Sequence, residues 1–79
     1  MTENIPKIPL SGLQQGQKAV IFNMQVYNEH LHKLMVFGLL PGAEVEVLQH
    51  FPSVVVAIGN TYLALDREIA EEILVVLGG

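Results

Sequence analysis

Apolar residues recur with a helical period shortly before the middle of the chain. Leu31, Leu34 and Met35 stand at i, i+3 and i+4, the spacing that places side chains on one buried stripe of a helix. Asn28 precedes this stripe and suits an N-cap, because its side chain can accept a free backbone N–H of the first turn. The pattern therefore predicts a helix over Glu29–Phe37.

A tight turn and a strand follow this helix directly. Gly38 predicts the end of the helix, since the residue that closes a helix in the left-handed conformation is most often Gly. Pro41 and Gly42 suit the central positions of a type II turn, where Pro presets φ and Gly accepts the positive φ that follows. The alternation of Glu and Val over 44–47 then predicts a strand over 44–50 with one face on a core.

An earlier segment, residues 18–26, predicts a strand that is apolar on both faces. One face carries Val20, Phe22, Met24 and Val26, and the opposite face carries Ala19 and Ile21 and is therefore also partly covered. Double coverage of this kind suits a curled sheet.

The C-terminal part of the chain predicts a hairpin, a short helix and a last strand. Strands over 53–58 and 61–65 flank Gly59-Asn60, a two-residue signal in which Gly59 supplies the positive φ of a type II′ turn. Asp66 can cap one short helical turn with Ile69 and Ile73 on its buried side. The run 73–76 closes the sheet.

Five short strands, tight turns and two small helices are typical of a mainly β fold. The sequence predicts a small, partly open β-barrel of the SH3-like kind with two short α-helices. We expect residues 1–8 to be a loose N-terminal arm and residues 9–77 to be a single domain, since no repeat, linker or composition change divides the chain.

Three segments together resemble the FeoA family, small cytosolic proteins that accompany the bacterial ferrous-iron transporter FeoB. The segments are residues 9–21 (PLSGLQQGQKAVI), residues 37–48 (FGLLPGAEVEVL), and residues 62–65 (YLAL) followed by Glu68, Ala70 and the apolar run 73–76. The resemblance implies an SH3-like fold and a role as a non-catalytic adaptor. The implied partner is the FeoB GTPase-transporter, and the implied location is the cytoplasm, with recruitment to the inner face of the membrane by that partner.

Composition narrows the classes of function. The chain has no cysteine, which excludes disulfides, thiolate nucleophiles and iron–sulfur ligation. A net charge of −4, with four basic residues against eight acidic ones, disfavours nucleic acid and anionic lipid as ligands. The longest apolar run, residues 34–43, is far shorter than the roughly 20 residues that span a bilayer, so direct membrane insertion is not expected. An apolar fraction of 51% leaves apolar surface for a partner.

The three histidines are weak candidates for a metal site. His30 and His32 fall in the predicted helix, where residues two apart point about 200° from one another and cannot chelate one ion. His50 falls on a hairpin, where a solvated side chain is expected. We therefore predict no required cofactor and leave open a weak contact with Fe²⁺ or another divalent ion.

Acidic and hydroxyl side chains give no catalytic pattern. Glu44 and Glu46 share a strand face, and Glu68 and Glu72 share a helix face, but solvated surfaces look the same. No base accompanies the serines, and a barrel interior filled by Val, Ile and Leu leaves little room for a substrate. The chain is predicted not to be an enzyme.

Partner contacts are expected at two places. Val36 lies on the helix side away from Leu34, and Leu40 begins the turn, so both are predicted to be exposed, whereas Phe37 and Leu39 are predicted to be core residues. His50 and Phe51 form the tip of the hairpin and are a second candidate edge.

Two other hypotheses stay open. The chain could be a transition-metal carrier or sensor that uses His30, His32, His50 and nearby carboxylates. FeoA proteins also resemble the SH3-like domain at the end of iron-dependent repressors. Because no helix-turn-helix segment or basic patch is present, the chain could be at most a detached regulatory module of that kind.

Overall fold

Six strands and three short helical segments make up the part of the chain that the structure describes, residues 6–24 and 29–78 of a computed structural model. In chain order they are β1 (Ile8–Pro9), the 3₁₀ helix η1 (Leu10–Gly12), β2 (Lys18–Met24), α1 (Glu29–Val36), β3 (Glu44–Gln49), β4 (Val54–Ile58), β5 (Thr61–Leu65), α2 (Arg67–Glu71) and β6 (Ile73–Leu77). Five strands were predicted; β1 is the additional one.

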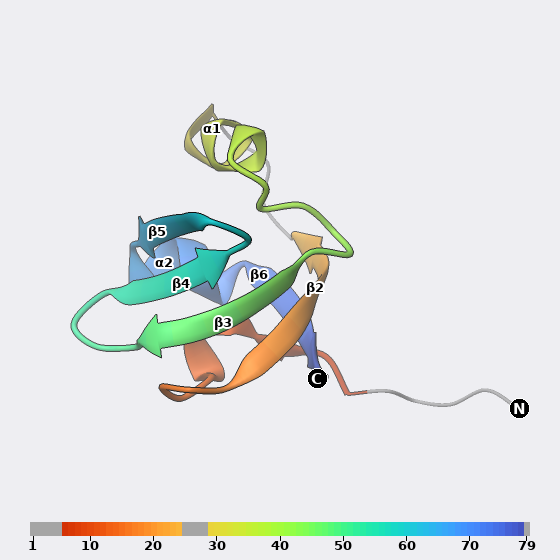
Figure 1. Cartoon of the computed structure of the whole chain (residues 1–79), viewed down its shortest axis with the longest axis vertical. Helices are drawn as coiled ribbons and strands as arrows, with labels where there is room; N and C mark the ends of the chain where they lie inside the picture. The colour runs from red at the N-terminus through yellow and green to blue at the C-terminus, as the bar shows by residue number, and fades with distance from the viewer. Residues whose placement is uncertain (1–5, 25–28, 79) are drawn as a thin grey trace, which may run out of the picture.

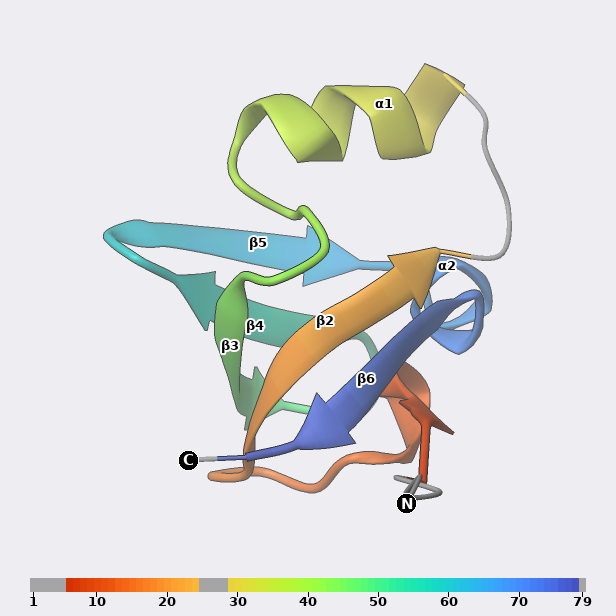
Figure 2. The ribbon, with the colours of Figure 1, turned by 90° about the vertical axis from the view of Figure 1, so that its right-hand side faces the viewer.

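The strands form one antiparallel sheet in the order β1-β6-β2-β3-β4-β5. The sheet curls, and α1 lies across one end of it (Figures 1 and 2). The helix α2, which follows the edge strand β5, packs against η1, which follows the edge strand β1, so a helical contact joins the two edges. The predicted fold class, a small mainly β barrel of the SH3-like kind with two short α-helices, is confirmed.

Apolar side chains fill the inside of the curled sheet. Buried positions alternate along β3, at Val45 and Val47, and along β4, at Val54, Val56 and Ile58, because successive side chains of a strand point to opposite faces. No polar or charged side chain is buried in the described residues. The remaining core side chains come from both α-helices, η1, three other strands and two connecting segments: Leu10, Leu13, Ala19, Ile21, Leu31, Leu34, Leu39, Leu63, Leu65, Ala70, Ile73 and Val75.

Strand β2 turns the face that carries Ala19 and Ile21 toward the core. Ala19 and Ile21 are each 1% exposed, whereas Phe22 is 48% exposed and Val20 is half-buried. The register against β6 shifts just after Ile21, and this β-bulge brings Met24 back against the core. Both faces are therefore partly covered, as predicted, and the more deeply buried face is that of Ala19 and Ile21.

Element boundaries agree with the predicted ones to within one or two residues. Helix α1 ends at Val36 rather than Phe37, and β3 ends at Gln49 rather than His50. The predicted N-cap Asn28 and the predicted strand residue Val26 lie outside the described residues.

The hairpin between β4 and β5 has a two-residue turn. Ile58 pairs with Thr61, and Gly59 has a φ of +58° while Asn60 does not have a positive φ. Positive φ at the first central residue alone distinguishes a type II′ turn from a type I′ turn.

The cap of α2 and the start of β1 differ in small ways from the expected pattern. Asp66 is the N-cap residue of α2, but its side chain makes no capping hydrogen bond, and its carbonyl accepts the Ala70 N–H at 3.0 Å. Ile8 pairs with Val75, so strand pairing starts one residue before the expected domain boundary.

Candidate functional site

The end of α1 is fixed by backbone hydrogen bonds. The Leu39 N–H donates to the Leu34 carbonyl at 3.3 Å, and the Gly38 N–H donates to the Met35 carbonyl at 3.0 Å, the two bonds of a Schellman motif. Gly38 has a φ of +107°, and a Cβ built on it would lie 3.3 Å from Cγ2 of Ile58. Since Leu39 is fully buried, the chain leaves the helix in one fixed direction.

The turn after this helix end is fastened to the sheet. The Ala43 N–H donates to the Leu40 carbonyl at 3.0 Å, and Gly42 has a φ of +93°, as the third residue of a type II turn requires. The Gly42 N–H donates to the Ile21 carbonyl at 2.7 Å, and the Ile21 N–H donates to the Ala43 carbonyl at 2.9 Å. The backbone from Leu40 to Ala43 is therefore held by β2.

Three large apolar side chains are exposed on this rigid segment, and we call them the helix-end patch. They are Val36, Phe37 and Leu40, with exposed fractions of 76%, 56% and 42%. The exposure expected for Val36 and Leu40 is observed, but Phe37 was predicted to be a core residue and is exposed. The reason is that α1 stops before Phe37 and the Schellman turn sends Leu39 into the core instead.

The second candidate surface, His50 and Phe51, lies in the loop between β3 and β4. Phe51 is 69% exposed and His50 is also exposed. An Arg67 guanidinium N–H donates to the His50 carbonyl, and the guanidinium carbon lies 6.0 Å from the centre of the Phe51 ring. This cation–π and hydrogen-bond pair fastens the loop to α2.

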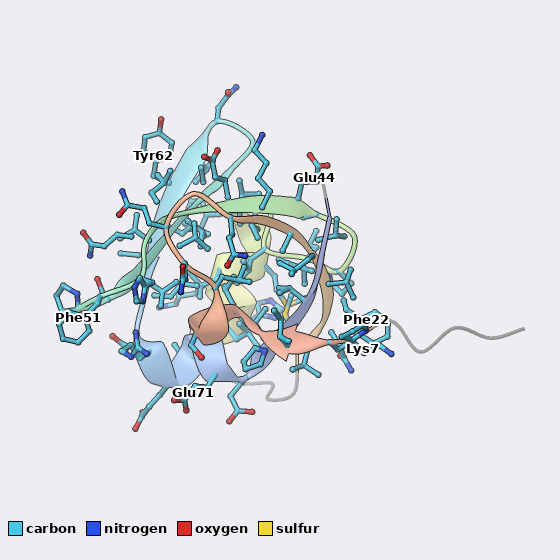
Figure 3. The ribbon with its side chains drawn as sticks, turned by 90° about the horizontal axis from the view of Figure 1, so that it is seen from below. Lys7, Phe22, Glu44, Phe51, Tyr62 and Glu71 are labelled. Atoms are coloured by element: carbon cyan, nitrogen blue, oxygen red, sulfur yellow. The ribbon has the colours of Figure 1, made fainter. Side chains whose placement is uncertain are left out.

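The structure keeps the two candidate surfaces apart. A Cβ built on Gly38 of the helix end would lie 3.3 Å from Ile58, the last residue of β4, whereas Phe51 lies three residues before the first residue of that strand, Val54. The surfaces therefore stand at opposite ends of β4, and Figure 3 shows the Phe51 ring pointing away from the barrel on its own side.

Sequence reasoning missed two features of these surfaces. Arg67 is 17 residues from His50, and no sequence pattern pairs two such positions. The exposure of Tyr62, which is 73%, could have been found, since Leu63 and Leu65 are apolar and alternate with it along β5.

Two of the three histidines share one helix, and the third lies beyond a strand. His30 and His32 are both in α1, which is the placement that argues against a shared ion, and His50 is exposed beyond β3. Within residues 6–24 and 29–78, no group of three His, Asp or Glu side chains is arranged to hold a metal ion.

Glu44 and Glu46 both lie on the outer side of β3, as their alternation with Val45 and Val47 predicts. They line an open depression of about 230 Å³ together with Lys18, Val45, Ala57 and Gly59. Lys18 is the strand partner of Glu46, so a basic side chain already stands beside these carboxylates.

A model of the FeoA domain matches residues 8–77. The chain belongs to the FeoA family. The family links it to ferrous-iron transport, and the FeoA protein from Chlorobium tepidum is similar to it, with 28% sequence identity and a TM-score of 0.84 over 91% of this chain and 71% of that one. No functionally curated protein matches the sequence significantly.

Two further structures share the fold. Stenotrophomonas maltophilia FeoA, described as a prokaryotic SH3 domain protein complexed with zinc, has 24% identity and a TM-score of 0.74 over 86% of this chain and 88% of that one. A manganese-dependent transcriptional repressor has 20% identity and a TM-score of 0.83 over 99% of this chain, which spans 45% of the repressor's length. At these identities the likeness concerns the fold.

Proposed function

We propose that this FeoA-family chain is a small non-catalytic accessory protein that binds the FeoB GTPase-transporter and modulates ferrous-iron uptake. Family membership supports the link to ferrous-iron transport. The S. maltophilia relative is described as a candidate activating factor of that transport, which supports an accessory role rather than a transporting one.

The helix-end patch is the observation that carries this proposal. Three large apolar side chains stand within five residues on a backbone that a Schellman motif and a type II turn hold in place. Apolar anchors that are already ordered before binding lose little conformational entropy on association. The patch is therefore suited to fill an apolar pocket of a folded partner.

A non-catalytic role fits the interior of the barrel. The core is filled by apolar side chains, and the depression beside Glu44 and Glu46 is open to solvent.

None of the described helices is long and apolar enough to cross a membrane. We place the chain in the cytoplasm, at the inner face of the membrane when its transporter recruits it.

Replacing Val36 and Leu40 with glutamate should weaken binding to the cytosolic portion of the transporter. We expect a loss of tenfold or more, the ~1.4 kcal/mol that corresponds to a modest apolar anchor. The melting temperature should change little, because both side chains are exposed. Calorimetry or surface plasmon resonance with the purified cytosolic portion measures the affinity, and circular dichroism measures the stability.

The matched control is Tyr62→Glu combined with Ala64→Glu. It adds the same two negative charges on exposed positions of β5 and should leave affinity unchanged. Phe51→Glu tests the second surface separately. An undiminished affinity of the Val36/Leu40 variant, or an equal loss in the β5 control, would place the interface elsewhere.

The carrier or sensor hypothesis has a separate test. The S. maltophilia relative is complexed with zinc, which supports testing this chain for a contact with a divalent ion. Because His32 and His50 lie on different elements, we propose that any such contact is weak, and we expect no micromolar binding of Fe²⁺ or Zn²⁺. Anaerobic isothermal titration calorimetry measures this, and a micromolar site with one ion per chain would establish the carrier hypothesis instead.

A further inference from the structure

The outer face of β2 and β6 is apolar, although it lies on the solvent side of the barrel. Val20 and Val76 are paired across the two strands and point outward, since their neighbours Ile21 and Val75 are buried. Phe22, at 48% exposure, continues this face along β2. In Figure 2 these two strands face the viewer and no other described element lies over them.

Opposite charges flank this apolar face on its two sides. On the β3 side, Glu44 is the strand partner of Val20 and is exposed. On the β1 side, Lys7 precedes Ile8, the strand partner of Val75, and so stands beside Val76. The Lys7 ammonium lies 4.7 Å from the centre of the Phe22 ring, and Figure 3 shows both side chains together on this side of the barrel.

A single row across the strands therefore reads Glu44, Val20, Val76, Lys7. The row has an acid at one end, a base at the other and two valines between them. A twofold axis parallel to the strands, running between β2 and β6, reverses the row in a facing copy. Each Glu44 then meets the Lys7 of the other copy, and each Val20 meets a Val76.

We propose that this face binds a second copy of the chain in that orientation. The alternative twofold axis, which runs across the strands, would place Glu44 on Glu44 and Lys7 on Lys7, and like charges at these positions repel. The charge pattern thus selects one arrangement. The interface does not include the helix-end patch, so a dimer leaves that patch accessible and this proposal does not depend on the proposed function.

The convex curvature of the sheet limits the contact area. A stable interface usually buries about 1,600 Å² in total, and two curved faces of this width bury less, so the dimer should be weak. We expect mostly monomer at about 5 µM and mostly dimer at about 500 µM, which corresponds to micromolar dissociation. Sedimentation equilibrium over this range measures it.

Charge exchange tests the orientation. Glu44→Lys and Lys7→Glu should each raise the dimer dissociation constant tenfold or more, because each homodimer then opposes two pairs of like charges. An equimolar mixture of the two variants should associate again, since in the mixed dimer both contacts join a lysine to a glutamate. The mean mass of the mixture should exceed that of either variant alone at the same total concentration.

Glu71→Lys is the matched control for Glu44→Lys. Both variants change the net charge from −4 to −2, and Glu71 is exposed on α2, away from Lys7 and Phe22 (Figure 3). The control should dimerise at least as well as the unchanged chain. A monomer at all concentrations, an equal loss in the control, or a mixture that fails to associate would overturn the proposal; binding of this face to another protein by an otherwise monomeric chain would identify a different occupant.

Discussion

Val45→Asp should strongly destabilise the protein, whereas Glu44→Lys, one residue earlier on β3, should leave the stability nearly unchanged. Val45 is 2% exposed in the core and Glu44 is exposed on the outer face. A buried carboxylate without a partner costs several kcal/mol, and we expect a loss of about 3 kcal/mol or more. That is a large share of the roughly 5–15 kcal/mol that stabilises a natural domain.

Circular dichroism with urea titration at low protein concentration measures both variants. At low concentration the proposed dimer does not contribute to the stability of either one. If both variants were equally stable, β3 would not present Val45 to the core, and the alternation along this strand would have to be reversed or absent.

Substitution of Gly38 should produce the second largest loss of stability. A side chain at a φ of +107° is strained, and its Cβ would also lie 3.3 Å from Cγ2 of Ile58. We expect Gly38→Ala to cost on the order of 1–2 kcal/mol, and Gly38→Val to cost more because a β-branched residue is excluded from this conformation.

Two other glycines serve as controls that distinguish backbone strain from steric contact of the added Cβ. Gly42 has a φ of +93° but open space at its Cβ position, and Gly12 has open space and no positive φ. Gly42→Ala should therefore lower the melting temperature through backbone strain and Gly38→Ala should lower it further, whereas Gly12→Ala should leave it unchanged or raise it slightly. Equal melting temperatures at Gly12 and Gly38 would show that the helix does not end through a left-handed residue there.

Local chemistry allowed the helix–turn–strand unit and the β4–β5 hairpin to be predicted. Gly38, Pro41 and Gly42 each have a conformational reason for their positions, and β3 is polar on one face only. Where only one face of a strand is apolar, the period of two fixes which side is buried.

Strand β2 shows where that reasoning ends. Both of its faces are apolar, so alternation does not choose between Ile21 and Phe22, and the bulge that follows Ile21 leaves no sign in the sequence. Strand β1 is two residues long and includes Pro9, too short a segment for any period. Strand β1 pairs with β6, and Val75 of β6, the partner of Ile8, is far away along the chain.

The two candidate surfaces also contain residues that local geometry predicts and residues that depend on distant contacts. Val36 and Leu40 could be placed from helix geometry, because their exposure depends on residues within one turn. The exposure of Phe37 depends on the residue at which α1 stops, and the anchoring of Phe51 depends on Arg67 in another element. Contacts between distant segments are set by the finished barrel.

The position of β6 has a consequence for biosynthesis. Strand β6, the last of the described strands, lies inside the sheet between β1 and β2, the two described strands that are made before the others. A ribosome must therefore release residues 73–77 before those early strands acquire their common neighbour, and until then β2 has an unpaired edge that is apolar on both faces. Nascent chains that stall before Ile73 should consequently engage chaperones or aggregate, whereas chains that have released β6 can close the sheet in one cooperative step.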